Sequence, residues 1–157
     1  MVTNQLGLEQ QSTQEIASRL NKLLASYQVF YINARGFHWN IKGEKFFELH
    51  AKFEELYNDL QLKNDELAER ILTLGAVPFH SYSDYLTHSS VPEAQNISDG
   101  KTAIEKIRDA FSILLPLQRA ILQLAGEAND EGTNALMSDY IRQQEKMVWM
   151  YNAYLNA

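Results

Sequence analysis

The chain has 157 residues, enough for one domain with a substantial hydrophobic core. It contains no cysteine, which excludes disulfides and thiolate metal sites. The formal net charge of −6 argues against non-specific binding to nucleic acid phosphates and mildly favours attraction of cations. No apolar segment reaches membrane-spanning length and the N-terminus has no signal-peptide pattern, so we expect a cytoplasmic protein without membrane contact.

Residues 1–11 are polar and rich in glutamine and asparagine, and we expect them to form a flexible N-terminal tail. Ser12 and Glu15 have the spacing of a capping box, which predicts that the first helix and the folded domain of residues 12–157 begin there. Apolar residues at helical spacing continue this helix to about Phe37. They are Ile16, Leu20, Leu23, Leu24, Tyr27, Phe30, Tyr31 and Ala34.

The second predicted helix runs from about Phe47 to Leu74. Its apolar residues fall within about 60° of arc and form a stripe that faces the core. They are Leu49, Phe53, Leu56, Leu60, Leu67, Ile71 and Leu74. Gly75 and Pro78 come next and are typical of a helix C-terminus.

A long connection of residues 79–96 follows, in which residues 82–88 predict a short helix. An up-and-down bundle needs only a short loop at this point. A longer connection favours a crossover, which lets the helices before and after it run parallel.

The third long helix is expected from about Ser98 to Ala128, with a kink near Ser112 caused by Pro116. The fourth is expected to be capped by Thr133 or Asn134 and to continue nearly to the end of the chain. The sequence therefore predicts an all-α fold, a ferritin-like four-helix bundle with one long crossover that contains a short helix.

Four side chains that can bind metal share one face of the second helix: His50, Glu54, Asp65 and Glu69. They fall within about 100° of arc, roughly 140° away from the apolar stripe. Each pair is one helical turn apart, but the two pairs are centred about 22 Å from each other along the axis. One ion with ligands at about 2 Å cannot bridge that distance, so each pair is half of a site.

The numbering indicates how such half-sites could be completed. Positions 50 and 69, and likewise 54 and 65, are equidistant from the point between Asp59 and Leu60. An identical helix packed antiparallel about a two-fold axis at this point would bring His50 and Glu54 against Asp65 and Glu69 of its partner. The hypothesis is therefore a homodimer with two equivalent intersubunit sites.

The choice of metal and the roles of the residues near this helix follow from ligand chemistry and position. Imidazole and carboxylate ligands without thiolate suit iron, manganese or zinc, and they bind metal only when the imidazoles are neutral. His38 alone is weak evidence, because a histidine at a helix end often caps carbonyl groups. Trp39 is expected to be an interface or core aromatic, or a residue beside the metal ligands. Taken singly, each charged candidate is more commonly an exposed or ion-paired helix residue than a ligand.

The remaining histidines and the acidic turn favour ordinary roles. His80 and His88 are expected to be loop residues. Glu127, Asp130 and Glu131 indicate a solvated turn, unless symmetry gathers several copies around an axis and forms a cation pore. The chain has no Glu-x-x-His motif, and the last two long helices contain no histidine, so a di-iron centre inside one bundle is disfavoured.

At these residues the chain resembles the Dps family of mini-ferritins, the DNA-binding proteins from starved cells. The residues that carry the resemblance are His38-Trp39, Gly43, Phe46-Phe47-x-Leu49-His50, Phe53-Glu54, Leu56-Tyr57, Asp65-Glu66-x-Ala68-Glu69-Arg70-Ile71 and Leu74-Gly75. The helices and the segment Val148-Trp149-Met150-Tyr151 extend the likeness over nearly the whole chain.

The resemblance implies a hollow shell of twelve subunits, built from two-fold dimers, that stores iron and protects against oxidative stress. In such a shell Fe(II) is oxidised, preferentially by hydrogen peroxide, and Fe(III) is kept as a mineral. The implied iron ligands are His38, His50 and Glu54 from one subunit, with Asp65 and Glu69 from its neighbour. Glu54 departs from the family, which commonly has Asp at that position.

DNA binding is the second departure. Family members that bind DNA often use a lysine-rich tail, whereas residues 1–12 and 150–157 of this chain contain no Lys or Arg. We therefore expect no appreciable DNA binding. The alternatives left open are a DNA-binding protein that compacts the nucleoid and a helical assembly without chemistry. Formation of soluble ferric product from ferrous ion and peroxide would separate these from a ferroxidase.

Overall fold

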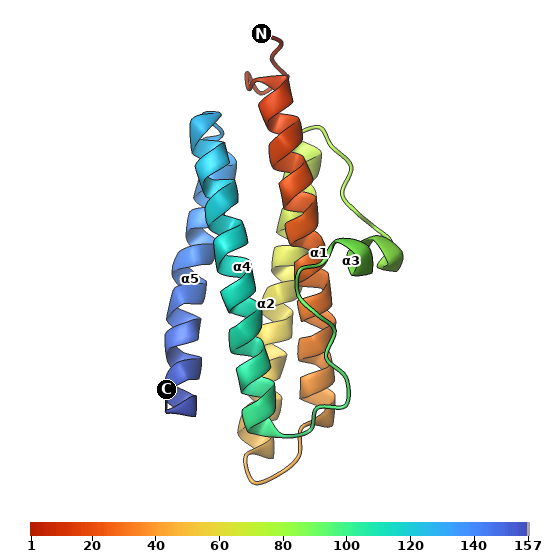
Figure 1. Ribbon diagram of the computed structural model, residues 1–157, viewed down its shortest axis with the longest axis vertical. Helices are drawn as coiled ribbons and strands as arrows, with labels where there is room; N and C mark the ends of the chain where they lie inside the picture. The colour runs from red at the N-terminus through yellow and green to blue at the C-terminus, as the bar shows by residue number, and fades with distance from the viewer. Residues whose placement is uncertain (157) are drawn as a thin grey trace.

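The computed structural model describes residues 1–156, and these residues form five α-helices (Figure 1). The helices are α1 (Gln10–Asn40), α2 (Phe46–Thr73), α3 (Tyr82–His88), α4 (Gly100–Glu127) and α5 (Glu131–Leu155). In this described range there is no β-strand, and no helix is long and apolar enough to cross a membrane. The predicted all-α class is confirmed.

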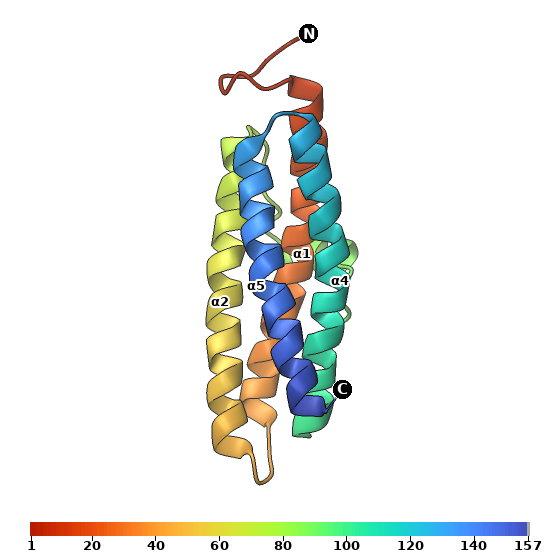
Figure 2. The same ribbon diagram turned by 90° about the vertical axis from the view of Figure 1, so that its left-hand side faces the viewer.

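The four long helices form a bundle with one crossover (Figures 1 and 2). α1 and α2 run antiparallel and are joined by a short turn. α4 and α5 are also antiparallel and are also joined by a short turn. Between them the chain returns along the length of the bundle, with α3 packed beside α1, so that α2 and α4 point the same way. This is the predicted ferritin-like arrangement with a short helix in the crossover.

The core lies between the long helices, and α1 is its central element. α1 packs against α2 on one side and against α4 on the other, which explains why apolar residues occupy most of its circumference. Phe30 of α1 meets Phe111 of α4 edge to face, with 5.1 Å between ring centroids. Both rings are almost fully buried, and each contributes about 2 kcal/mol through removal of its surface from water.

The first helix begins at Gln10, two residues before the predicted start. The N-cap is Glu9, whose carboxylate accepts hydrogen bonds from the Ser12 backbone N–H (2.9 Å) and from the Ser12 hydroxyl. Ser12 therefore binds the cap and is not the cap itself, so the capping-box prediction is wrong. Before the helix, Asn4 Oδ1 accepts from the N–H groups of Leu6 and Leu8; the predicted mobility of residues 1–11 stays a prediction.

The last helix also begins earlier than predicted, at Glu131, because Asp130 supplies the cap. Asp130 Oδ1 accepts from the backbone N–H of Thr133 at 3.0 Å and from Arg70 Nη2 at 2.7 Å. The Arg70 guanidinium lies across Gly132, where a Cβ would stand 2.7 Å from Arg70 Nη2. The cap of α5 thus also ties it to the end of α2, a contact between distant segments that the sequence does not reveal.

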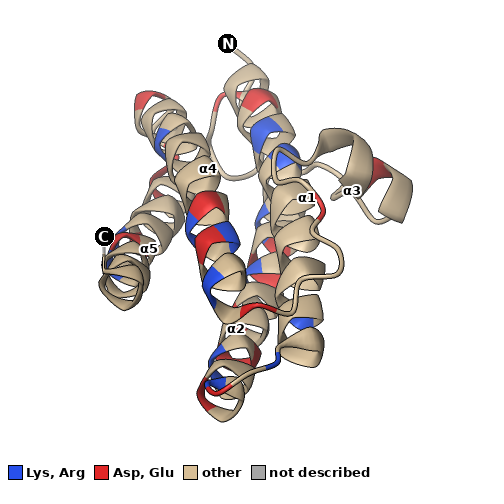
Figure 3. Cartoon of the chain, turned by 60° about the horizontal axis from the view of Figure 1, so that its bottom comes forward, with Lys and Arg blue, Asp and Glu red and all other residues tan. Residues whose placement is uncertain are grey.

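Pro116 lies inside α4, and the helix continues through it to Glu127. The bend predicted near Ser112 stays a prediction. Acidic and basic residues are mixed along the long helices, with blue and red segments adjoining on α4 (Figure 3). No surface of one sign dominates the view, which fits a modest net charge of −6 per chain.

Candidate metal centre

His38 and His50 form a reciprocal pair where the end of α1 meets the start of α2. Their rings stack with 3.8 Å between centroids and 14° between planes. His38 Nδ1 lies 2.7 Å from the His50 carbonyl oxygen, and His50 Nδ1 lies 2.8 Å from the His38 carbonyl oxygen. Because a carbonyl oxygen only accepts, both Nδ1 atoms must carry the proton.

This arrangement prepares two imidazoles for metal binding. With Nδ1–H donating to a carbonyl, the neutral ring has its lone pair on Nε2, the tautomer and orientation that metal-binding histidines commonly show. His38 is 8% exposed and His50 is half-buried, so packing also limits ring rotation. The sequence indicated both histidines as candidate ligands, but it did not show that each ring is oriented by a hydrogen bond to the other residue's carbonyl group.

The carboxylates lie on the exposed side of α2, as the helical period predicts. Glu54, Asp65 and Glu69 are all exposed, and the Tyr57 hydroxyl donates to Glu54 Oε1 at 3.4 Å. Within the described residues, no three histidine or carboxylate side chains come together as a metal site. The described part of one subunit does not assemble such a site by itself, and the division into two half-sites stays a prediction.

An aromatic cluster around Arg35 borders the histidine pair and was not predicted. The guanidinium carbon of Arg35 lies 4.6 Å from the ring centroid of Tyr57, 5.1 Å from that of Trp39 and 5.8 Å from that of Tyr31. Arg35 Nη1 also donates to the Tyr31 hydroxyl at 2.8 Å, a hydrogen bond that raises the pKa of the guanidinium. Trp39 is 59% exposed, so it is not a core aromatic of the single subunit.

Three neutral polar side chains form a hydrogen-bonded ring within the largely apolar core of the bundle. The Tyr27 hydroxyl donates to Gln118 Oε1 (2.5 Å), Gln118 Nε2 donates to Gln144 Oε1 (2.8 Å), and Gln144 Nε2 donates to Tyr27 Oη (2.5 Å). All three residues are at most 1% exposed, and burial raises the pKa of Tyr27 far above its usual range. The ring itself contains only neutral groups, and the absence of a di-iron centre inside the bundle stays a prediction.

Exposed apolar residues accompany the carboxylates on α2. Phe47 is 82% exposed, Leu62 is 67% exposed and Leu72 is 57% exposed. Phe47 and Leu72 are equidistant from the point between Asp59 and Leu60, just as His50 and Glu69 are. The same holds for Leu62 and Tyr57. One two-fold axis would therefore pair apolar residues with apolar residues while it pairs the histidine half-site with the carboxylate half-site.

The other sequence candidates lie apart from the histidine pair. His80 Nδ1 lies 2.9 Å from the Pro78 carbonyl oxygen, and His88 stacks on Phe79 with 4.6 Å between centroids. Asp130, 2% exposed, is the α5 cap described above, whereas Glu127 and Glu131 are exposed beside it. The role of this turn as a cation pore stays a prediction.

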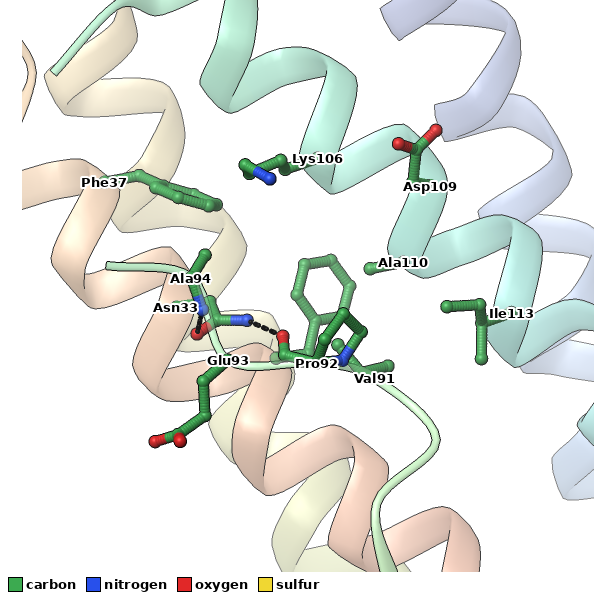
Figure 4. A pocket seen from close by; sticks show the side chains of 11 residues that line it. Asn33, Phe37, Val91, Pro92, Glu93, Ala94, Lys106, Asp109, Ala110 and Ile113 are labelled. Carbon is green, nitrogen blue, oxygen red and sulfur yellow. Dashed lines mark hydrogen bonds between the residues drawn. The ribbon is translucent and has the colours of Figure 1, made fainter. Parts of the chain in front are cut away.

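A small cavity of about 90 Å³ lies beneath the crossover, between α1 and α4 (Figure 4). Asn33 fastens the crossover over it, because its side chain donates to the Pro92 carbonyl (2.9 Å) and accepts from the Ala94 N–H (2.9 Å). Its lining includes Lys106 and Asp109 but none of the candidate ligands, so we assign the cavity no part in the metal centre.

Comparison with known proteins agrees with this fold. Residues 17–157 match the ferritin-like domain family, so the chain is a ferritin-like protein. A crystal structure of the Dps protein of Vibrio cholerae O1, described as a ferritin-like diiron-carboxylate protein, has a TM-score of 0.97 and 62% identity, with 99% of this chain and 98% of that chain covered. The "DNA protection during starvation protein" of Porphyromonas gingivalis is 44% identical over 148 residues, covering 94% of this chain and 93% of the relative. The chain belongs to the Dps family.

A further relative has no assigned activity. An uncharacterized protein of Haemophilus influenzae is 51% identical over 153 residues, covering 98% of this chain and 96% of its own length. The Dps protein of Bacillus brevis is more distant, with 34% identity and a TM-score of 0.89 over 92% of this chain and 97% of that chain.

Proposed function

We propose that this protein is a ferroxidase and iron store that oxidises Fe(II) at sites shared by two subunits, with hydrogen peroxide as the preferred oxidant. Two Fe(II) ions give up one electron each to one peroxide molecule, and with two protons the products are two Fe(III) ions and two water molecules. Because peroxide is fully reduced in this step, no hydroxyl radical is released, and the protein protects against oxidative stress.

The observation that carries the proposal is the His38–His50 pair. Both rings have Nδ1 engaged and Nε2 left for a metal ion, and exposed Glu54 follows His50 by one helical turn on α2. Nitrogen ligands suit Fe(II), and carboxylate oxygens stabilise the Fe(III) product. Iron is the substrate here, and Asp65 and Glu69 of a neighbouring subunit would complete its ligand set.

The shared midpoint of the polar and apolar pairs on α2 supports the dimer, and the family supports a larger assembly. We propose a hollow dodecamer of such dimers, in which Fe(III) accumulates as a mineral. Association also gives the exposed Phe47, Leu62 and Leu72 side chains a partner, which removes an apolar surface from water.

The test is anaerobic loading of the protein with Fe(II), followed by peroxide, with ferric product measured by near-ultraviolet absorbance and particle mass measured in parallel. We expect His50→Ala and Asp65→Ala each to slow oxidation by more than about tenfold while the shell still assembles. His80→Ala and Asp109→Ala are matched controls, since both residues are exposed and lie outside the site. Unchanged kinetics in the first two variants would refute the assignment.

A further inference from the structure

Tyr57 joins the two helices of the candidate metal centre. Its ring meets the His38 ring edge to face, with 5.3 Å between centroids and 74° between planes. Its hydroxyl reaches in the other direction and donates to Glu54 Oε1 at 3.4 Å. One side chain thus contacts a candidate ligand from α1 and another from α2.

The Tyr57 ring is held from two further sides. Arg35 lies over its face, 4.6 Å from the centroid, and Tyr31 meets it edge to face at 6.1 Å. Tyr31 is itself fixed by the hydrogen bond from Arg35 Nη1. A phenol in such a setting has little rotational freedom, so its hydroxyl is a rigid donor.

Glu54 is a candidate ligand that would be positioned by such a donor. It is exposed and its side chain has one more rotatable bond than aspartate, so a free Glu54 would spread its carboxylate over many positions. A hydrogen bond to one carboxylate oxygen limits these positions and leaves the other oxygen for the metal. The distance of 3.4 Å is long, as is common before a metal or substrate draws a site together.

We propose that Tyr57 is a positioning residue: by donating to Glu54, it fixes the carboxylate for metal binding. The inference rests on the function proposed above. It assigns to Tyr57 and, through it, to Arg35 a role in how tightly the site binds its metal ion, without direct contact with that ion.

The experiment is an anaerobic titration of the assembled protein with Co²⁺, whose visible absorption reports ligand binding without oxidation. Tyr57→Phe removes only the hydroxyl and keeps the ring between His38 and Arg35. We expect the Co²⁺ Kd to rise about tenfold, with an altered absorption band and unchanged thermal stability. Tyr82→Phe, at a tyrosine 87% exposed on α3, is the control and should leave Kd unchanged.

The same substitution in a Glu54→Asp background tests the mechanism. Aspartate is one methylene shorter and draws its carboxylate away from Tyr57, so Tyr57→Phe should then change Kd by less than about twofold. No effect in the Glu54 protein, or an equal loss in both backgrounds, would overturn the role of Tyr57. Absence of saturable Co²⁺ binding by the unmodified protein would instead overturn the proposed function, and this inference with it.

Discussion

Tyr27 shows how much a single hydroxyl contributes inside this bundle. It donates to Gln118 and accepts from Gln144. Tyr27→Phe would therefore remove one hydrogen bond from each of the two side-chain amides, at a buried position where water cannot replace it. We expect a loss of about 2 kcal/mol in the free energy of unfolding, measured by chemical denaturation of the assembled protein. Tyr82→Phe, on the surface, should change the free energy by less than about 0.5 kcal/mol; equal effects would contradict the argument.

At the residue scale, the sequence predicted on which face of a helix a side chain lies better than it predicted which other residues that side chain contacts. The helical period alone placed His50, Glu54, Asp65 and Glu69 on one face of the helix that points away from the apolar stripe, because that face follows from 100° per residue. It could not predict that each histidine bonds to the other's carbonyl, since this depends on how α1 and α2 meet in space. The ligand roles of these residues stay predictions.

At the element scale, Asp130 carries two functions at the start of α5. It caps the helix and pairs with the half-buried Arg70 of α2. Asp130→Ala should therefore lower the free energy of unfolding by about 2 kcal/mol, from loss of the cap and of the charged partner, measured by thermal or urea denaturation. Asp139→Ala breaks an exposed pair with Arg142 and should cost about 0.5 kcal/mol or less. A similar loss in both would show that the Asp130 contacts contribute little.

Glu9 makes the start of α1 sensitive to acid. The hydroxyl and backbone N–H of Ser12 hold the pKa of Glu9 below its usual value of 4.5. A lowered pKa in the folded state means that the cap stabilises the helix at neutral pH and stops doing so as pH falls through that lowered value. We expect the protection factor of the Ser12 amide, its exchange rate relative to that of an unstructured amide at the same pH, to decrease at such pH, measured by hydrogen exchange. Glu9→Gln should make this protection factor less dependent on pH; the exposed Glu44→Gln should not.

Helix boundaries show which part of the fold could not be predicted from the sequence at the scale of single elements. The existence and order of the helices, and the short helix in the crossover, follow from strong apolar periods and from Gly75 and Pro78. The starts of α1 and α5 were missed by two to four residues because Glu9 and Asp130 act as caps. Several acceptors compete near each helix start, and only the three-dimensional structure shows which one reaches an N–H group.

At the scale of the whole molecule, charge opposes DNA binding. Twelve copies of a chain with net charge −6 would carry a total of about −72, and no Lys or Arg lies in residues 1–12 or 150–157 to offset it locally. We expect no band shift of duplex DNA by the purified assembly at physiological salt. A shift under these conditions would favour the nucleoid-binding alternative, and its salt dependence would count the phosphates contacted.

The proposed intersubunit site leads to a prediction that can be tested only in an assembly of subunits. In a mixed dimer of one His50→Ala subunit and one Asp65→Ala subunit, one site carries both defects and the other carries neither. Random mixing of the two inactive variants by joint refolding should therefore restore about a quarter of the sites. Mixing His50→Ala with Glu54→Ala is the control, because both changes affect the same half-site and every mixed dimer remains defective. Fast peroxide-dependent oxidation should return in the first mixture only; if neither mixture recovers, the ligands belong to one chain and the two-fold site is wrong.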